Sequence, residues 1–175
     1  MVLPVNAGSM RRPVALALIV LGLAATAAHA QPGRPPGRLD PAGLNTLLGS
    51  LGYHPREVRN EAEAEFEITV RPPDGRAITT RVALSRDGSV VWLVAWLKKV
   101  PPGRTISGNA ILGMLVENDR IGPTHFSYND SRRWFFLNKP VVNQDLTAER
   151  LRTELATLGA LVARTEALWD SDRWK

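Results

Sequence analysis

The chain has 175 residues, a formal net charge of +5 and no cysteine. Its hydrophobic share of 44% fits a globular protein and not a disordered or collagen-like one. The lack of cysteine excludes disulfides, thiolate zinc sites, iron–sulfur clusters, a cysteine nucleophile and a lipoprotein anchor.

The first thirty residues are predicted to be a secretory signal peptide. Arg11 and Arg12 precede an apolar run over 14–28, and the small residues at 28–30 form an A-x-A cleavage site. We expect cleavage after residue 30, which would make the protein periplasmic or secreted, without stable membrane insertion once the signal is removed. An uncleaved anchor is the alternative.

Residues 31–38 read QPGRPPGR and predict a flexible leader, since prolines and glycines at this density do not form a packed element. Residues 39–175 then form one domain with enough chain for a single core. The basic excess of this part is small and spread along the sequence, so nucleic-acid binding is not expected.

The predicted elements begin with a helix of about 12 residues after Asp40-Pro41, with leucines at helical spacing. Alternating or continuous apolar residues then predict three strands, at 65–70, 78–84 and 89–97, with Asp87-Gly88 as the turn of a hairpin. The last of these strands is apolar on both faces.

The second half of the chain predicts a helix from about 107 to 119, two strands at 124–128 and 133–137, and a closing helix from Thr147. The second helix is expected to bury Ile111, Leu112, Leu115 and Val116, and the closing helix carries an apolar stripe that runs to residue 169. The order α-β-β-β-α-β-β-α predicts a single α+β domain, in which a mostly antiparallel five-stranded sheet is covered by helices on one face and ends in a long C-terminal helix.

The strand at 90–97 carries the candidate interface. One face of an antiparallel sheet covered by helices normally meets water, and apolar side chains on both faces therefore need a second cover. The candidates for this surface are Val91, Trp92, Leu93, Val94, Trp96 and Leu97. The cover is expected to be a second copy of the chain or a protein or peptide partner; a helix of the same chain is the alternative.

The element order and four local segments resemble the type III secretion chaperone-like fold of the Tir-chaperone and YbjN-type families. The segments are Leu47–Tyr53, Val91–Val94, Ile111–Asn118 and Trp134–Leu137. The resemblance covers residues 39–169. It implies a non-enzymatic and often homodimeric module that binds protein segments.

Catalytic and metal-binding motifs are scarce in this sequence. The two histidines beyond the predicted signal, His54 and His125, have no partners at metal-ligand spacing, and no serine-hydrolase elbow or P-loop occurs. No cofactor or metal is therefore predicted. His125, which shares a strand face with Ser127, is the one ligand candidate, and a small periplasmic enzyme or ligand-binding domain built on it is the alternative function. A structural subunit of an envelope complex is a further alternative.

Charged residues on the predicted sheet have ordinary and functional interpretations. Glu61, Glu63, Glu65 and Glu67 alternate, which favours a solvated strand face whose carboxylates pair with arginines such as Arg81. Arg132 and Arg133 stand close to Trp134, and they offer either an anion or cation–π contact or a solvated hairpin shoulder.

Overall fold

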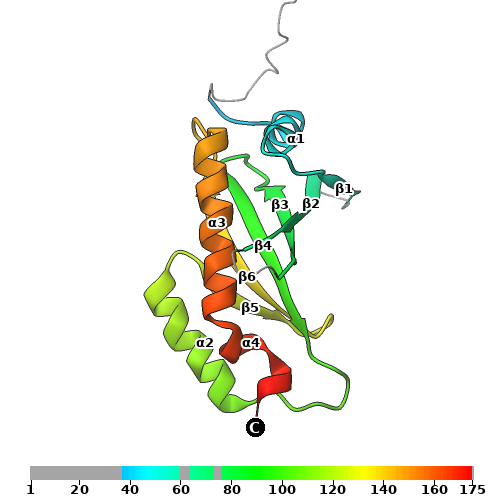
Figure 1. Cartoon of the computed structure of the whole chain (residues 1–175), viewed down its shortest axis with the longest axis vertical. Helices are drawn as coiled ribbons and strands as arrows, with labels where there is room; N and C mark the ends of the chain where they lie inside the picture. Colours follow the sequence, from blue (N-terminus) through cyan, green and yellow to red (C-terminus); the bar gives the residue numbers. More distant parts are fainter. Residues whose placement is uncertain (1–36, 60–63, 73–75, 175) are drawn as a thin grey trace, which may run out of the picture. The chain divides into compact units, whose positions relative to one another are not determined.

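The computed structural model describes residues 37–59, 64–72 and 76–174 (Figure 1). The predicted signal peptide and residues 31–36 of the predicted leader lie outside this range. Gly37 and Arg38 are attached to the domain, because the Asp145 N–H donates to the Gly37 carbonyl at 2.7 Å and Arg38 forms a bridge with Gln144. The domain thus begins before the predicted residue 39. None of the helices in the described ranges combines the length and hydropathy that crossing a bilayer requires.

The described elements form one antiparallel sheet and a set of helices. In chain order they are α1 (Pro41–Ser50), β1 (Arg56–Arg59), β2 (Ala64–Val70), β3 (Ile78–Leu84), β4 (Val90–Lys99), α2 (Gly108–Ile121), β5 (His125–Asn129), β6 (Trp134–Val142), α3 (Ala148–Arg164), α4 (Glu166–Trp169) and the 3-10 turn η1 (Ser171–Arg173). The strand order is β1-β2-β3-β4-β6-β5. The α+β prediction is confirmed, but the sheet has six strands and not five. The prediction missed β1, since its sequence REVR has too little apolar alternation.

The helices begin at side-chain caps that the sequence supplies. Asp40 accepts a hydrogen bond from the N–H of Gly43 at 2.6 Å, and Thr147 accepts one from the N–H of Arg150 at 3.2 Å. Each cap satisfies a donor that the first turn of a helix leaves free. These contacts fix the starts of α1 and α3 close to the predicted positions.

The core lies between the sheet and the helices on one of its faces. Helix α3 crosses this face and contacts β2, β4 and β6 (Figure 1). Its Leu151, Leu155 and Leu158 are at most 1% exposed. The alternation of β4 places Val91 and Leu93 in the same core, where both are 0% exposed.

The burial of residues on β4 contradicts part of the predicted interface. Val91 and Leu93 are enclosed by the chain's own core and have no surface to offer a partner, and Leu97 is half-buried against that core. Trp92, Val94 and Trp96 are half-buried on the opposite face, which we call the open face. Binding by these three residues stays a prediction.

The closing helix is interrupted where one continuous helix was predicted. Helix α3 ends at Arg164, because Thr165 leaves helical geometry while its hydroxyl donates to the Leu161 carbonyl at 2.7 Å. Helix α4 then turns Trp169 into the core, where its indole N–H donates to the Val162 carbonyl at 3.1 Å. The apolar stripe was predicted correctly, but the bend was not.

Candidate functional site

Helix α2 buries the face opposite to the predicted one. Its inner side consists of Ala110, Gly113, Met114 and Glu117, and it packs against α4 and β5. Glu117 is 7% exposed, and it accepts a hydrogen bond from the guanidinium of Arg164 at 2.6 Å. A carboxylate thus occupies a position that an ordinary amphipathic helix gives to an apolar side chain.

The apolar residues of α2 face solvent. Ile111 is 41% exposed, Leu112 61%, Leu115 59% and Val116 47%, so the prediction that they form the buried stripe was wrong. We call these four residues the α2 stripe. Val142, at 55%, is the one further large apolar side chain that is exposed in the described ranges. The stripe is therefore the main concentration of exposed apolar surface among the described residues.

A close helix contact explains this orientation of α2. A β-carbon added at Gly113 would lie 2.9 Å from the Cδ2 atom of Leu168 on α4. Glycine therefore leaves room for the Leu168 side chain against the inner face of α2. Small residues at Ala110 and Gly113 are a sequence signal for such packing, whereas the larger side chains nearby predicted the opposite face.

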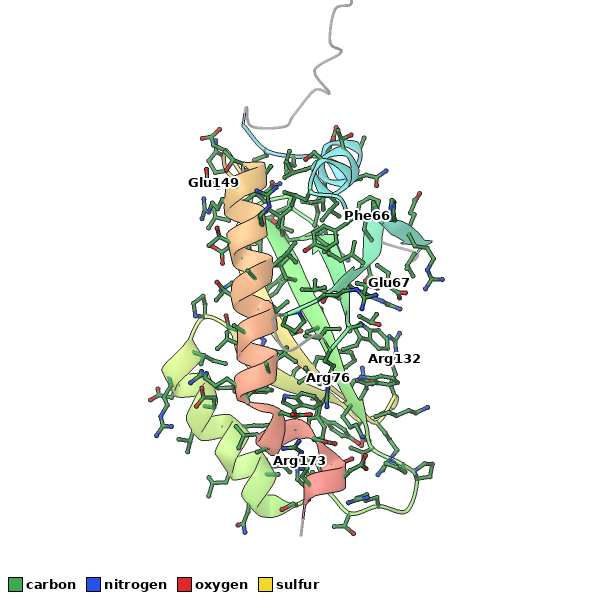
Figure 2. The ribbon with its side chains drawn as sticks, viewed as in Figure 1. Phe66, Glu67, Arg76, Arg132, Glu149 and Arg173 are labelled. Atoms are coloured by element: carbon green, nitrogen blue, oxygen red, sulfur yellow. The ribbon has the colours of Figure 1, made fainter. Side chains whose placement is uncertain are left out.

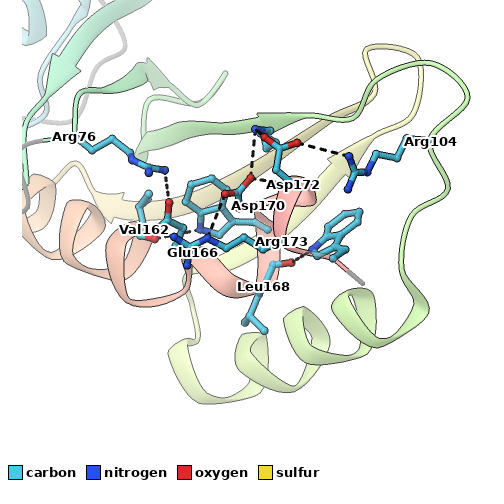
Figure 3. Close-up of polar contacts among 11 residues, drawn as sticks. Arg76, Arg104, Val162, Glu166, Leu168, Asp170, Asp172 and Arg173 are labelled. Atoms are coloured by element: carbon cyan, nitrogen blue, oxygen red, sulfur yellow. Dashed lines mark hydrogen bonds and ion pairs between the residues drawn. The ribbon is translucent and has the colours of Figure 1, made fainter.

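The C-terminal segment is held against the sheet by ion pairs, which we call the C-terminal clasp. Figure 3 shows Glu166, Asp170 and Asp172 from this segment facing basic side chains. Their partners are Arg76, Lys98, Arg104 and Arg173.

Lys98 contacts two carboxylates of the clasp, those of Asp170 and Asp172. The contact with Asp172 raises the pKa of Lys98, with a further contribution from Asp170, whose carboxylate lies 3.3 Å away. The same contact with Lys98 lowers the pKa of Asp172. The segment also carries Trp174, whose indole N–H donates to the Leu168 carbonyl at 3.0 Å, so this residue is docked and not loose.

An apolar groove of about 170 Å³ adjoins the α2 stripe, between α2 and the edge strand β5. Asn118 of α2 accepts from the Phe126 N–H at 2.6 Å and donates to the Phe126 carbonyl at 3.3 Å. The side-chain amide thus occupies backbone groups that an incoming strand would need. This contact blocks edge-to-edge pairing at Phe126 of β5.

The open face carries an aromatic cluster at its centre. The Trp96 ring lies 5.1 Å from the rings of Trp134 and Phe136, both in edge-on geometry. The guanidinium of Arg81 lies 4.4 Å from the Trp96 ring centroid, and that of Arg132 lies 5.9 Å from it. Both distances fit cation–π contacts. Cross-strand neighbours therefore cover part of Trp96.

Ion pairs flank the aromatic cluster on β1, β2 and β3. Glu65 pairs with Arg81 at 3.0 Å, as expected, whereas Glu67 pairs at 2.6 Å with Arg56, which was not among the expected partners. Figure 2 shows Glu67 and Arg132 away from α3. Glu61 and Glu63 lie outside the described residues.

The neighbouring arginines Arg132 and Arg133 have different environments. Arg133 donates to the backbone carbonyls of Val100 and Arg104 and so supports the loop after β4. Arg132 is exposed, and its guanidinium approaches the ring of Trp96. The cation–π interpretation therefore applies to Arg132, and an anion contact stays a prediction.

His125 is half-buried on β5 beside the open face. Its ring lies 6.3 Å from the Trp92 ring, and its Nδ1 atom lies 3.2 Å from the Pro123 carbonyl oxygen. Ser127 accepts a hydrogen bond from Asn138 at 2.7 Å. The described ranges hold no cluster of three or more His, Cys, Asp or Glu side chains that could hold a metal ion. These contacts assemble no nucleophile–base pair around His125.

Comparison with known proteins gives one structural similarity. No family model matches the chain, and no curated protein does. A chain in the structure of the HopA1–SchA chaperone–effector complex is similar at a TM-score of 0.48 and 11% sequence identity, over 69% of this chain and 88% of that chain. At this TM-score and identity, neither role in that complex transfers to the present chain. The family assignment stays a prediction.

Proposed function

We propose that this chain is an exported, non-enzymatic, protein-binding module, two copies of which join through the α2 stripe. The observation that supports this most strongly is the inverted burial of α2, which encloses Glu117 and exposes Leu112 and Leu115. Such an arrangement loses hydrophobic stabilisation in an isolated chain and recovers it when a partner covers the stripe.

The exposed area sets the strength of this association. The exposed fractions of the α2 stripe together equal about two fully exposed aliphatic side chains, which are worth roughly 3–6 kcal/mol when covered. Two chains would gain about twice that amount, against an association cost of about 4–15 kcal/mol. The stripe and the adjoining groove therefore favour a weak dimer, with a dissociation constant of about 1 μM or higher.

The order of residues in the stripe favours a second copy as the partner. Ile111-Leu112 and Leu115-Val116 are arranged symmetrically about the midpoint between 113 and 114. In an antiparallel pair of α2 helices, Leu112 would oppose Leu115 of the second copy, as an isologous interface requires. Asp119 would then approach the other helix N-terminus, where the helix dipole favours a negative charge.

Other parts of the proposal come from the sequence. Residues 1–30 have the composition of a secretory signal, so we place the protein in the periplasm or outside the cell. The type III secretion chaperone-like resemblance favours a protein or peptide as the further partner. The contacts of His125 and Ser127 leave the enzymatic alternative without a supporting observation.

Sedimentation velocity over a concentration series tests the proposal. The protein should associate as its concentration rises, Leu112→Glu should remain monomeric, and Val142→Glu should associate like the parent. Val142 is a matched control because it is exposed to a similar extent but lies outside the stripe. Circular dichroism checks that each variant is folded. A protein that stays monomeric at about 1 mM, or a Leu112→Glu variant that associates normally, would overturn the proposal.

A further inference from the structure

We infer that the open face around Trp96 binds an extended protein segment through a carboxylate side chain. The inference rests on the proposed protein-binding function and adds a second surface to it, on the opposite side of the sheet from α3. It is based on three observations: a hollow of limited size, an arginine without an ion pair, and buried donors without acceptors.

The hollow is large enough for a side chain and small for a metabolite. Its volume is about 230 Å³, below the roughly 300–1,000 Å³ of typical small-molecule sites. Ala83, Val94 and Phe136 supply apolar lining, and Trp96 supplies an aromatic wall. A segment lying across the strands could insert one residue here while its backbone stays outside.

The charge of the hollow favours an anionic side chain. Arg81, Arg132 and Glu65 are the charged residues of its lining. Glu65 is already engaged by Arg81 at 3.0 Å. Arg132 forms no ion pair within the described residues, and its guanidinium faces the Trp96 ring at 5.9 Å. A carboxylate would give this guanidinium a planar, bidentate partner.

The unsatisfied polar atoms of the cluster are all donors. Two lining groups, the indole N–H of Trp96 and Nε of Arg81, are buried without a hydrogen-bond partner among the described residues. The same holds for the indole N–H of Trp134, whose ring packs against Trp96 just outside the lining. The Glu67 carboxylate lies 3.9 Å from Nε of Arg81, beyond hydrogen-bond distance. Buried donors without acceptors destabilise a fold. A ligand oxygen that reaches these donors, as the side chains adjust, would satisfy them and so stabilise the complex. Donors without acceptors select a ligand that supplies oxygen atoms.

Indole NMR signals provide a direct test with internal controls. The probe is the capped peptide acetyl-Val-Glu-Phe-Glu-Val-amide, and its glutamine counterpart is the neutral control. Titration into the purified protein should shift the indole N–H signals of Trp96 and Trp134. The signals of Trp169 and Trp174 should stay in place, because their N–H groups donate to backbone carbonyls elsewhere. The glutamine peptide should bind about tenfold more weakly.

Two arginine variants separate specific recognition from general attraction. Arg132→Gln should weaken binding of the glutamate peptide about tenfold, to the level of the glutamine peptide. Arg86→Gln should leave binding unchanged, since Arg86 is an exposed arginine in the turn before β4, away from the cluster. Equal binding of both peptides, an unaffected Arg132→Gln variant, or shifts that spare Trp96 and Trp134 would overturn the inference.

Two further measurements determine which class of ligand binds and whether the α2 dimer is present. If phosphate alone shifts the same two indole signals at concentrations as low as the peptide does, the site binds oxyanions in general and the inference of a protein segment is wrong. Sedimentation of the same samples reports whether the α2 dimer is present. Loss of peptide binding with a normal dimer refutes only this inference, and loss of the dimer with normal peptide binding refutes only the α2 interface.

Discussion

A charge-pair exchange tests the antiparallel α2 dimer residue by residue. Leu112 and Leu115 are 61% and 59% exposed, so covering each one is worth about 1–2 kcal/mol. In a symmetric dimer, Leu112→Glu or Leu115→Lys alters two equivalent contacts, at a cost of about 2–4 kcal/mol. This corresponds to dissociation constants roughly 30- to 700-fold higher.

Mixing the two variants should restore the association. In the mixed dimer one contact becomes Glu opposite Lys, and the second keeps Leu opposite Leu. We expect the mixed dimer to form about tenfold more tightly than either variant with itself. Native mass spectrometry, with one variant isotope-labelled, distinguishes the three possible dimers. If the mixture contains no excess of mixed dimer, Leu112 does not oppose Leu115 and the antiparallel arrangement is wrong.

Three further predictions concern the fold that supports these surfaces. Asn143→Ala removes three hydrogen bonds that the buried Asn143 side chain forms with the backbone of Leu39 and Gly88, and chemical denaturation should show a loss of about 3 kcal/mol. Gly113→Val should displace the Leu168 side chain through a clash with its Cδ2 atom, so the indole signal of Trp174, which donates to the Leu168 carbonyl, should shift while the sheet signals stay. Hydrogen bonds from Ser85 and Ser89 lower the pKa of Asp87, so an NMR titration should give a pKa below that of an ordinary aspartate, and its contribution to stability should be lost only as the pH falls through that lowered pKa.

The alternation of apolar residues along β4 predicted both of its faces correctly. A strand has a period of two, so the sequence separates Val91 and Leu93 from Trp92 and Trp96 without knowledge of the fold. Which face the helices would cover was not predictable, since both were apolar. From the sequence, either face of β4 could therefore be the open one. The position of α3 determines that it is the face with Trp92, Val94 and Trp96.

Helix α2 shows why burial is harder to predict than periodicity. Its apolar stripe was recognised, but the assumption that the most apolar face is buried failed because α4 packs against the face with Ala110 and Gly113. The ion pair between Glu117 and Arg164 joins residues 47 positions apart. Contacts over such distances depend on the tertiary arrangement and leave no local pattern in the sequence.

The position of α4 determines which face of α2 is exposed. Helix α4 occupies the small-residue face of α2, so the apolar face is left outside as long as α4 stays in place. The raised pKa of Lys98 means that its contribution to stability is present at neutral pH and is lost as the pH rises through that raised pKa. Because the pKa of Asp172 is lowered, its contribution to stability persists at pH values at which an ordinary aspartate is already protonated. Together with the buried Trp169, these ion pairs fix α4 against α2 and leave the α2 stripe exposed and available for a partner.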